Sequence, residues 1–306
     1  MTRGARIDVI APSGALLSRQ AFDHGLAKLR ALGFTVRSRV PAQSWQRFAD
    51  TDDGRLAQIH DAARARDVDA VMIARGGYGL SRLLERIDWQ LVADSARSGV
   101  RWIGFSDFTV LQLGLLAITG APTWTGPAIC GDFGERDCDP YTLGQFRELL
   151  AGNVPAVEWQ LEDERAPLSI EGTLWGGNLA MIASVAGTRW MPAIDRGLLF
   201  VEDTAEHPYR VERMLLQLLH SGVLARQRAL LFGAFTEWKP SPLDNGFDLP
   251  AVARYVEQRA GIPVIRGLPF GHVPRRAALG IGVPYRLETG SVSGAEGAAA
   301  ARLVPL

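Results

Sequence analysis

Residues 100–118 constrain the fold more than any other part of this sequence. The β-branched and aromatic residues of 100–107 predict a buried strand, and the longer apolar run 108–118 predicts a buried helix. Ser106 then lies at a sharp turn between the two. Such a turn exposes a serine hydroxyl and directs the next amide, that of Asp107, to where a tetrahedral oxyanion would form. Ser106 is therefore a candidate nucleophile, although a serine here could also simply cap the helix.

Strands and helices alternate through the first half of the chain. Short β-branched segments bounded by glycine or proline predict strands, and segments with apolar residues at helical spacing predict helices between them. The predicted strands are residues 7–11, 34–38, 70–74 and 100–107. The predicted helices are residues 19–32, a segment around Ile59, and residues 80–92, 108–118 and 141–150. This order predicts an α/β fold with a doubly wound, mostly parallel sheet.

A glycine-rich turn, Arg75-Gly76-Gly77-Tyr78-Gly79, follows the third predicted strand. Backbone amides at the carboxyl end of a parallel strand commonly converge on anionic groups. The spacing matches neither of the two common nucleotide phosphate motifs, so we favour a turn that supplies one oxyanion amide, that of Gly77. Non-catalytic binding of a small anion is the competing interpretation.

The sequence pattern changes after residue 150. The stretch Gly152-Asn153-Val154-Pro155 and the acidic residues 162–164 are typical of a linker. We therefore expect a first domain of residues 1–155 and a second, smaller mixed β/α domain of residues 156–306. In the second domain, residues 197–202 predict a buried strand and residues 208–220 an amphipathic helix. The alanine-rich tail near Ala298 is expected to fray.

Composition narrows the classes of function. The 33 basic and 33 acidic residues balance, so no net charge attracts nucleic acid or an anionic membrane. The two cysteines, Cys130 and Cys138, have no neighbours at metal-ligand spacing, so we expect no metal site and no disulfide framework. Because the sequence has no signal-like core and no membrane-length apolar run, we expect no membrane partner and a cytoplasmic location.

A nucleophilic serine needs an imidazole base and a group that fixes the tautomer of that imidazole. Among the five histidines, His272 is the first candidate because it lies on a proline-flanked loop with no helical face to fill. His207, at a helix start, is the second. The orienting acid should end a buried strand, as Glu202 does, but Asp203 and Glu206 are also possible and spacing alone leaves the choice open.

Seven short motifs occur in one order over nearly the whole chain. They are residues 11–14, residues 48–52 with Arg55, residues 75–79, 104–107 and 176–179, residues 200–203 with 208–210, and residues 271–272. Together they resemble the serine L,D-carboxypeptidases of murein recycling and their relatives, the microcin C immunity peptidases. The resemblance implies a Ser-Glu-His triad in which Ser106 is the nucleophile, His272 the general base and then acid, and Glu202 the orienting carboxylate.

The same resemblance implies several further properties. The amides of Gly77 and Asp107 would form the oxyanion hole, no metal or organic cofactor would be needed, and the protein would be a homodimer. The implied reaction is hydrolysis of the L,D-amide bond that releases terminal D-alanine from a small murein tetrapeptide, through an acyl-enzyme on Ser106. A microcin C-type amidase, which cleaves peptidyl or aminoacyl nucleotide analogues, is the alternative with the same chemistry.

Substrate-binding residues are expected next to these motifs. A terminal carboxylate calls for a cation, and Arg75, Arg210 and Arg275 are the candidates. The candidates for the pocket lining are Trp124, Thr125, Trp175 and Asn178. Thr125 stands where members of the resembled family often have histidine, which bears on substrate choice more than on the triad.

Overall fold

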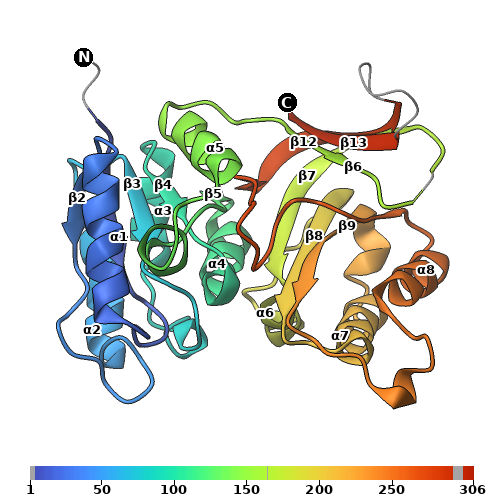
Figure 1. The fold of residues 1–306 in the computed structure, drawn as a ribbon, viewed down its shortest axis with the longest axis horizontal. Helices are drawn as coiled ribbons and strands as arrows, with labels where there is room; N and C mark the ends of the chain where they lie inside the picture. Colours follow the sequence, from blue (N-terminus) through green and yellow to red (C-terminus); the bar gives the residue numbers. More distant parts are fainter. Residues whose placement is uncertain (1–3, 164, 292–298) are drawn as a thin grey trace. The chain divides into compact units, whose positions relative to one another are not determined.

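The computed structural model of the chain describes residues 4–163, 165–291 and 299–306 (Figure 1). Contacts between Cα atoms divide the chain into two compact units, Met1–Val154 with Pro274–Gly280, and Pro155–Val273 with Ile281–Leu306. Thr125 fastens the segment 274–280 to the first unit. Its hydroxyl donates a hydrogen bond to the carbonyl of Ala277 at 3.0 Å and accepts one from the amide of Leu279 at 2.8 Å.

The first unit is built on a six-stranded sheet in the order β11-β5-β4-β3-β1-β2. Neighbouring strands from β2 through β5 run parallel. The strands are β1 (Arg6–Ile10), β2 (Thr35–Ser38), β3 (Ala70–Ile73), β4 (Arg101–Ile103), β5 (Thr123–Trp124) and β11 (Gly280–Ile281). β3 is buried along its whole length, as the continuous apolar run of a central parallel strand predicts.

Helices cover both faces of this sheet (Figure 1). Because crossovers between parallel strands are right-handed, α1 lies on one face, packed on the π-helical turn η3, and α2, α3 and α4 lie in a row on the other. The bounds are α1 (Arg19–Ala31), α2 (Asp52–Arg64), α3 (Trp89–Arg97), α4 (Thr109–Thr119), η3 (Ile129–Gly134) and α5 (Pro140–Leu150). The predicted doubly wound α/β fold is confirmed.

One predicted helix of the first unit is wrong. Residues 80–92 do not form one helix: the chain makes the 3₁₀ turn η1 (Leu80–Arg82) and then α3, which begins only at Trp89. The side chain of Asp88 accepts a hydrogen bond from the amide of Leu91 at 3.0 Å and so caps α3. Leu83, Leu84 and Ile87, between the two elements, are buried by tertiary contacts. Their spacing resembles that of a helix although the chain there is not helical.

The second unit is built on a seven-stranded mixed sheet in the order β10-β9-β8-β7-β12-β13-β6. β7 to β10 run parallel, and β12, β13 and β6 pair antiparallel. The strands are β6 (Val157–Gln160), β7 (Leu168–Asn178), β8 (Gly197–Thr204), β9 (Gln227–Thr236), β10 (Val264–Ile265), β12 (Val283–Ser291) and β13 (Ala299–Pro305). The predicted mixed β/α architecture of the second half is confirmed.

Three helices of the second unit follow the successive parallel strands β7, β8 and β9, and pack side by side (Figure 1). They are α6 (Leu179–Val185), α7 (Pro208–His220) and α8 (Leu249–Ala260), with the 3₁₀ turns η4 (Leu224–Arg226) and η5 (Pro242–Asp244) between them. The predicted helix 208–220 is confirmed at both ends. It begins at Pro208, because proline fits the first helical position, where a missing amide proton costs nothing.

The C-terminal segment departs from expectation. Residues 299–305 form β13, which pairs with both β12 and β6, so the prediction of a fraying tail is wrong for these residues. Ala298 itself lies outside the described residues. A search of the described helices finds none with the length and apolar character needed to span a bilayer.

Candidate active site

Ser106 lies in a strained turn at the head of α4. β4 ends at Ile103, a 3₁₀ turn covers residues 106–108, and α4 begins at Thr109. Ser106 has φ of 62°, in the left-handed region that non-glycine residues rarely adopt. Holding such a residue costs about 1–3 kcal/mol, and such residues cluster where a side chain must be presented at a fixed angle.

The glycine-rich turn, residues 75–79, contacts Ser106. A methyl group on Gly76 would lie 2.8 Å from both Cβ and Oγ of Ser106, so only glycine fits there. The amide of Gly14 donates a hydrogen bond to the carbonyl of Gly76 at 3.2 Å, and Gly77 has φ of +106°. The structure therefore brings the Gly76-Gly77 backbone next to Ser106 within the first unit.

Arg75 lies beside the same turn. Its Nη1 donates a hydrogen bond to the carbonyl of Ala15 at 2.8 Å, and a methyl group on Gly77 would lie 3.0 Å from that nitrogen. A cation therefore adjoins the Gly77 backbone, where it adds positive potential for an anionic group. The other two cation candidates cover tyrosine rings: Arg210 lies 5.9 Å from the Tyr209 centroid, and Arg275 lies 3.9 Å from that of Tyr141.

Glu202 and His272 form a hydrogen-bonded pair in the second unit. Nδ1 of His272 lies 2.7 Å from Oε2 of Glu202, a carboxylate with no solvent exposure. With Nδ1 protonated and donating to that carboxylate, Nε2 is left as the basic nitrogen of the imidazole. The pair therefore has the arrangement of a general base and the acid that orients it.

The backbone around Glu202 is adapted to its position. The pairing of β8 with β9 changes register between Val201 and Asp203, so that two residues of β9, Gly233 and Ala234, lie opposite Glu202. Bulges re-aim a side chain and are frequent beside active sites. Two glycines make room for the carboxylate: a methyl group on Gly233 would lie 3.3 Å from Cβ of Glu202, and one on Gly271 would lie 3.2 Å from its Oε2.

Asn178 connects two buried carboxylates at the end of β7. Its Nδ2 donates to Oε1 of Glu202 at 3.2 Å and to Oδ1 of Asp203 at 2.9 Å, while its Oδ1 caps α6. Asp203 also accepts hydrogen bonds from the amides of Ala180 and Thr204. Burial, more than the neighbouring charge of Glu202, raises the pKa of Asp203 to about 6. Sequence spacing gave no sign of this network.

Comparisons with known proteins place the chain in a family. The family model of the LD-carboxypeptidase N-terminal domain matches residues 7–126, and that of the C-terminal domain matches residues 171–287. The chain belongs to the LD-carboxypeptidase family. A probable murein peptide carboxypeptidase of Bacillus subtilis is 31% identical over 94% of this chain and 90% of its own length. The murein tetrapeptide carboxypeptidase of Pseudomonas aeruginosa is 32% identical over 92% of this chain and 93% of its own.

Solved structures give the same family. The muramoyltetrapeptide carboxypeptidase from Oxalobacter formigenes superposes with a TM-score of 0.86 at 41% identity, and the match covers 97% of this chain and 99% of that one. The microcin C7 self immunity protein MccF superposes with a TM-score of 0.81 at 23% identity, over 94% of this chain and 93% of its own, which shows a shared fold.

Three residues expected to line the substrate pocket are buried. Trp124 is 4% exposed, and Trp175 is fully buried and donates from its indole to Oε1 of Gln227 at 2.9 Å. Thr125 is 1% exposed, with its hydroxyl bonded to the segment 274–280 as described. His207, the second candidate base, pairs with Asp244 at 3.1 Å instead of with an acid of the Glu202 network.

Residues 48–52 and Arg55 form one of the seven motifs, but the sequence alone indicated no role for them. In the structure the fully buried Arg55 donates to the carbonyl of Pro12 at 2.7 Å, and its guanidinium carbon lies 4.5 Å from the centroid of the Phe48 ring. A methyl group on Gly79 would lie 2.5 Å from Nη1 of Arg55, so the guanidinium backs the glycine-rich turn. The sequence does place Arg55 shortly after the helix start Asp50-Thr51-Asp52, and this spacing could have indicated a structural role for the arginine. Among the described residues, no three His, Cys, Asp or Glu side chains cluster as metal ligands would.

Proposed function

We propose that this LD-carboxypeptidase is a serine peptidase that cleaves the L,D-amide bond of murein tetrapeptides and releases their terminal D-alanine. The names and high coverage of the Bacillus, Pseudomonas and Oxalobacter relatives support this substrate class. The observation that carries the serine mechanism is the left-handed Ser106 with the Gly76 backbone against its Oγ. This is the geometry of a nucleophile presented next to backbone amides.

In the proposed reaction, Nε2 of His272 takes the proton of Ser106 Oγ as Oγ attacks the scissile carbonyl carbon. Glu202 accepts the Nδ1–H bond and so holds the tautomer and stabilises the imidazolium that forms. The developing oxyanion accepts hydrogen bonds from the amides of Gly77 and Asp107.

Collapse of the tetrahedral intermediate breaks the C–N bond, and the imidazolium of His272 gives its proton to the amine of the departing D-alanine. Water then attacks the acyl-enzyme with His272 again as the base, which releases the tripeptide and restores Ser106 Oγ–H. Arg75, next to the Gly77 backbone, is our candidate for favouring the anionic carboxylate end of the substrate.

Replacement of the nucleophile tests this function. In Ser106→Ala, release of D-alanine from a synthetic murein tetrapeptide, followed by mass spectrometry, should fall on the order of a millionfold, because triad members act as a unit. The matched control Ser98→Ala changes an exposed serine of the same unit and should keep full activity. Full activity in Ser106→Ala would rule out the serine mechanism.

A second substrate class belongs in the same assay. An aminoacyl sulfamoyl adenylate tests the amidase alternative, and turnover of this compound in preference to the tetrapeptide would reassign the substrate. Two other properties stay predictions: the homodimeric state, which rests on the resemblance, and the cytoplasmic location, which rests on the sequence pattern. Sedimentation of the purified chain would test the first.

A further inference from the structure

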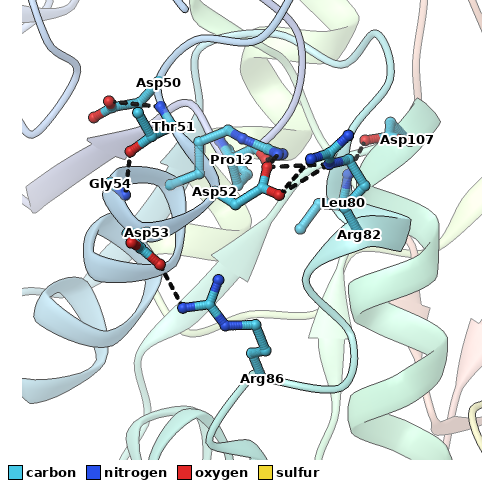
Figure 2. Close-up of polar contacts among 11 residues, drawn as sticks. Pro12, Asp50, Thr51, Asp52, Asp53, Gly54, Leu80, Arg82, Arg86 and Asp107 are labelled. Atoms are coloured by element: carbon cyan, nitrogen blue, oxygen red, sulfur yellow. Dashed lines mark hydrogen bonds and ion pairs between the residues drawn. The ribbon is translucent and has the colours of Figure 1, made fainter.

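The carboxylate of Asp107 is the group that the proposed mechanism leaves unused. Only the backbone amide of this residue acts in that mechanism, yet its side chain is directed inward and is 1% exposed. Oδ2 accepts a hydrogen bond from the amide of Leu80 at 3.0 Å (Figure 2). Burial raises the pKa of Asp107, and the Leu80 hydrogen bond acts in the opposite direction by favouring the charged form.

This hydrogen bond joins two segments that are far apart in sequence. Asp107 directly follows Ser106 in the turn before α4, and Leu80 is the first residue of η1, at the end of the glycine-rich turn. Gly77, three residues before Leu80, carries one proposed oxyanion amide, and Asp107 carries the other. One side chain therefore connects the backbone segments of both donors.

The glycine-rich turn would otherwise have much conformational freedom. Gly77 and Gly79 both have positive φ, +106° and +147°, and glycine loses more entropy on being fixed than any other residue. Arg55 packs against Gly79, and Asp52 forms ion pairs with Arg55 and Arg82, so the turn is also supported from the α2 side. Figure 2 shows the pair of Asp52 with Arg82. The Asp107 bond is the support that comes from the nucleophile side.

We propose that the Asp107 carboxylate is a positioning residue that sets the spacing of the two oxyanion amides by tying the glycine-rich turn to the Ser106 turn. The inference rests on the proposed function. Oxyanion donors act more strongly on the transition state than on the bound substrate, so loss of their spacing lowers kcat and leaves KM nearly unchanged.

Two variants of one shape test the proposal. Asp107→Asn keeps an oxygen acceptor for the Leu80 amide, whereas Asp107→Leu fills the same space without one. We expect kcat for the tetrapeptide to fall about 100-fold in Asp107→Leu and less than about tenfold in Asp107→Asn, with KM within about twofold in both. Circular dichroism and thermal melting would establish that each variant is folded.

A transition-state readout separates positioning from general damage. A tripeptide boronic acid, which forms a tetrahedral anion on the serine, should lose affinity for Asp107→Leu by about the factor lost in kcat/KM. The product tripeptide should bind all variants equally. The control Asp53→Ala breaks the exposed ion pair with Arg86 in the same unit and should leave every value unchanged (Figure 2).

The outcomes divide cleanly. Equal kcat values in Asp107→Leu and Asp107→Asn, or a product affinity that falls together with the boronate affinity, would overturn the positioning role. If Asp107→Leu does not fold, Asp107→Ala, which also lacks the acceptor, takes its place: a boronate affinity about 100-fold weaker than that of Asp107→Asn supports the role, and equal affinities refute it. A fully active Ser106→Ala variant would instead refute the proposed function, so the two failures are distinguishable.

Discussion

The first unit presents a hydroxyl and backbone amides through backbone conformation, whereas the second unit holds two carboxylates and an imidazole through side-chain hydrogen bonds. In the first, Ser106 and Gly77 have positive φ and Gly76 has no room for a methyl group. In the second, Glu202 and Asp203 are almost completely buried and share the amide of Asn178.

The two regions therefore respond to different disturbances. A site made by backbone conformation depends on shape, so an added methyl group should damage it at any pH. A site made by buried carboxylates depends on charge, because desolvation of an ionised group costs free energy that only hydrogen bonds and protonation can offset. Substitutions that alter shape in one unit and charge in the other test this distinction.

Among the substitutions that compare the two units, the largest effect is expected from removal of the charge on Glu202. Glu202→Gln no longer accepts the Nδ1–H bond of His272 as a carboxylate does, so the imidazole loses its fixed tautomer and its stabilised cation. We expect kcat to fall on the order of 10⁴-fold in the D-alanine release assay. The matched control Glu206→Gln, a partly exposed residue of the same unit, should stay within twofold. A loss below tenfold would contradict the assigned orienting role.

A smaller effect is expected from the added methyl group of Gly76→Ala. That group would lie 2.8 Å from Ser106 Oγ and must displace either the hydroxyl or the glycine-rich turn. Loss of one oxyanion donor typically costs 10²–10³-fold in kcat, and we expect a value of about that size with little change in melting temperature.

Gly144→Ala is the matched control for this substitution. Gly144 lies in α5, and a methyl group there would have no atom within 4 Å. It should keep full activity and gain about 0.5–1 kcal/mol in free energy of unfolding, since alanine is the better helix former. Equal activity of the Gly76→Ala and Gly144→Ala variants would show that the first unit does not depend on shape at this position.

The sequence predicted those elements whose signals are local. α4 follows from a continuous apolar run, and α7 from an apolar face that begins at Pro208. The predicted helix 80–92 failed because the helix begins only at Trp89, where Asp88 caps it, and the chain before it forms the short turn η1. β13 was missed for a different reason: its alanines have low strand propensity, and its partner strands β12 and β6 supply the pairing.

The same limit applies to the candidate site. Ser106 was reached from its turn between a strand and a helix, and His272 from its proline-flanked loop, whereas only the resemblance selected Glu202 over Asp203 and Glu206. The network around Asn178 could not be read from sequence, because it joins the end of β7 to the part of β8 where the pairing with β9 changes register. Pattern reasoning finds groups that carry chemistry, and tertiary contacts decide which of them are positioned together.

The smallest effect is a pH dependence of stability in the second unit. The pKa of Asp203 is raised to about 6 in the folded chain and returns to near 3.8 on unfolding. Between these values the folded state binds the extra proton, so the contribution of Asp203 to stability is greatest below pH 4 and is lost as the pH rises through 6. Two pKa units correspond to about 2–3 kcal/mol. In Asp203→Asn this pH dependence is absent, and urea unfolding at pH 4 and 7 measures it as the change in the stability difference between variant and wild type.

The carboxylate of Glu257, whose pKa is shifted in the opposite direction to that of Asp203, is a control for the direction of this pH dependence. Arg165 lowers the pKa of Glu257 below its ordinary value of 4.5, so the stability from this pair is present above that pH and is lost as the pH falls further. Relative to wild type, Glu257→Gln should therefore gain stability as the pH falls below about 4.5, whereas Asp203→Asn should gain it as the pH rises from 4 to 7. A stability difference for Asp203→Asn that stays constant over this range would mean that burial does not hold a proton on Asp203. The contrast between a second unit controlled by charge and a first unit controlled by shape would then rest on Glu202 alone.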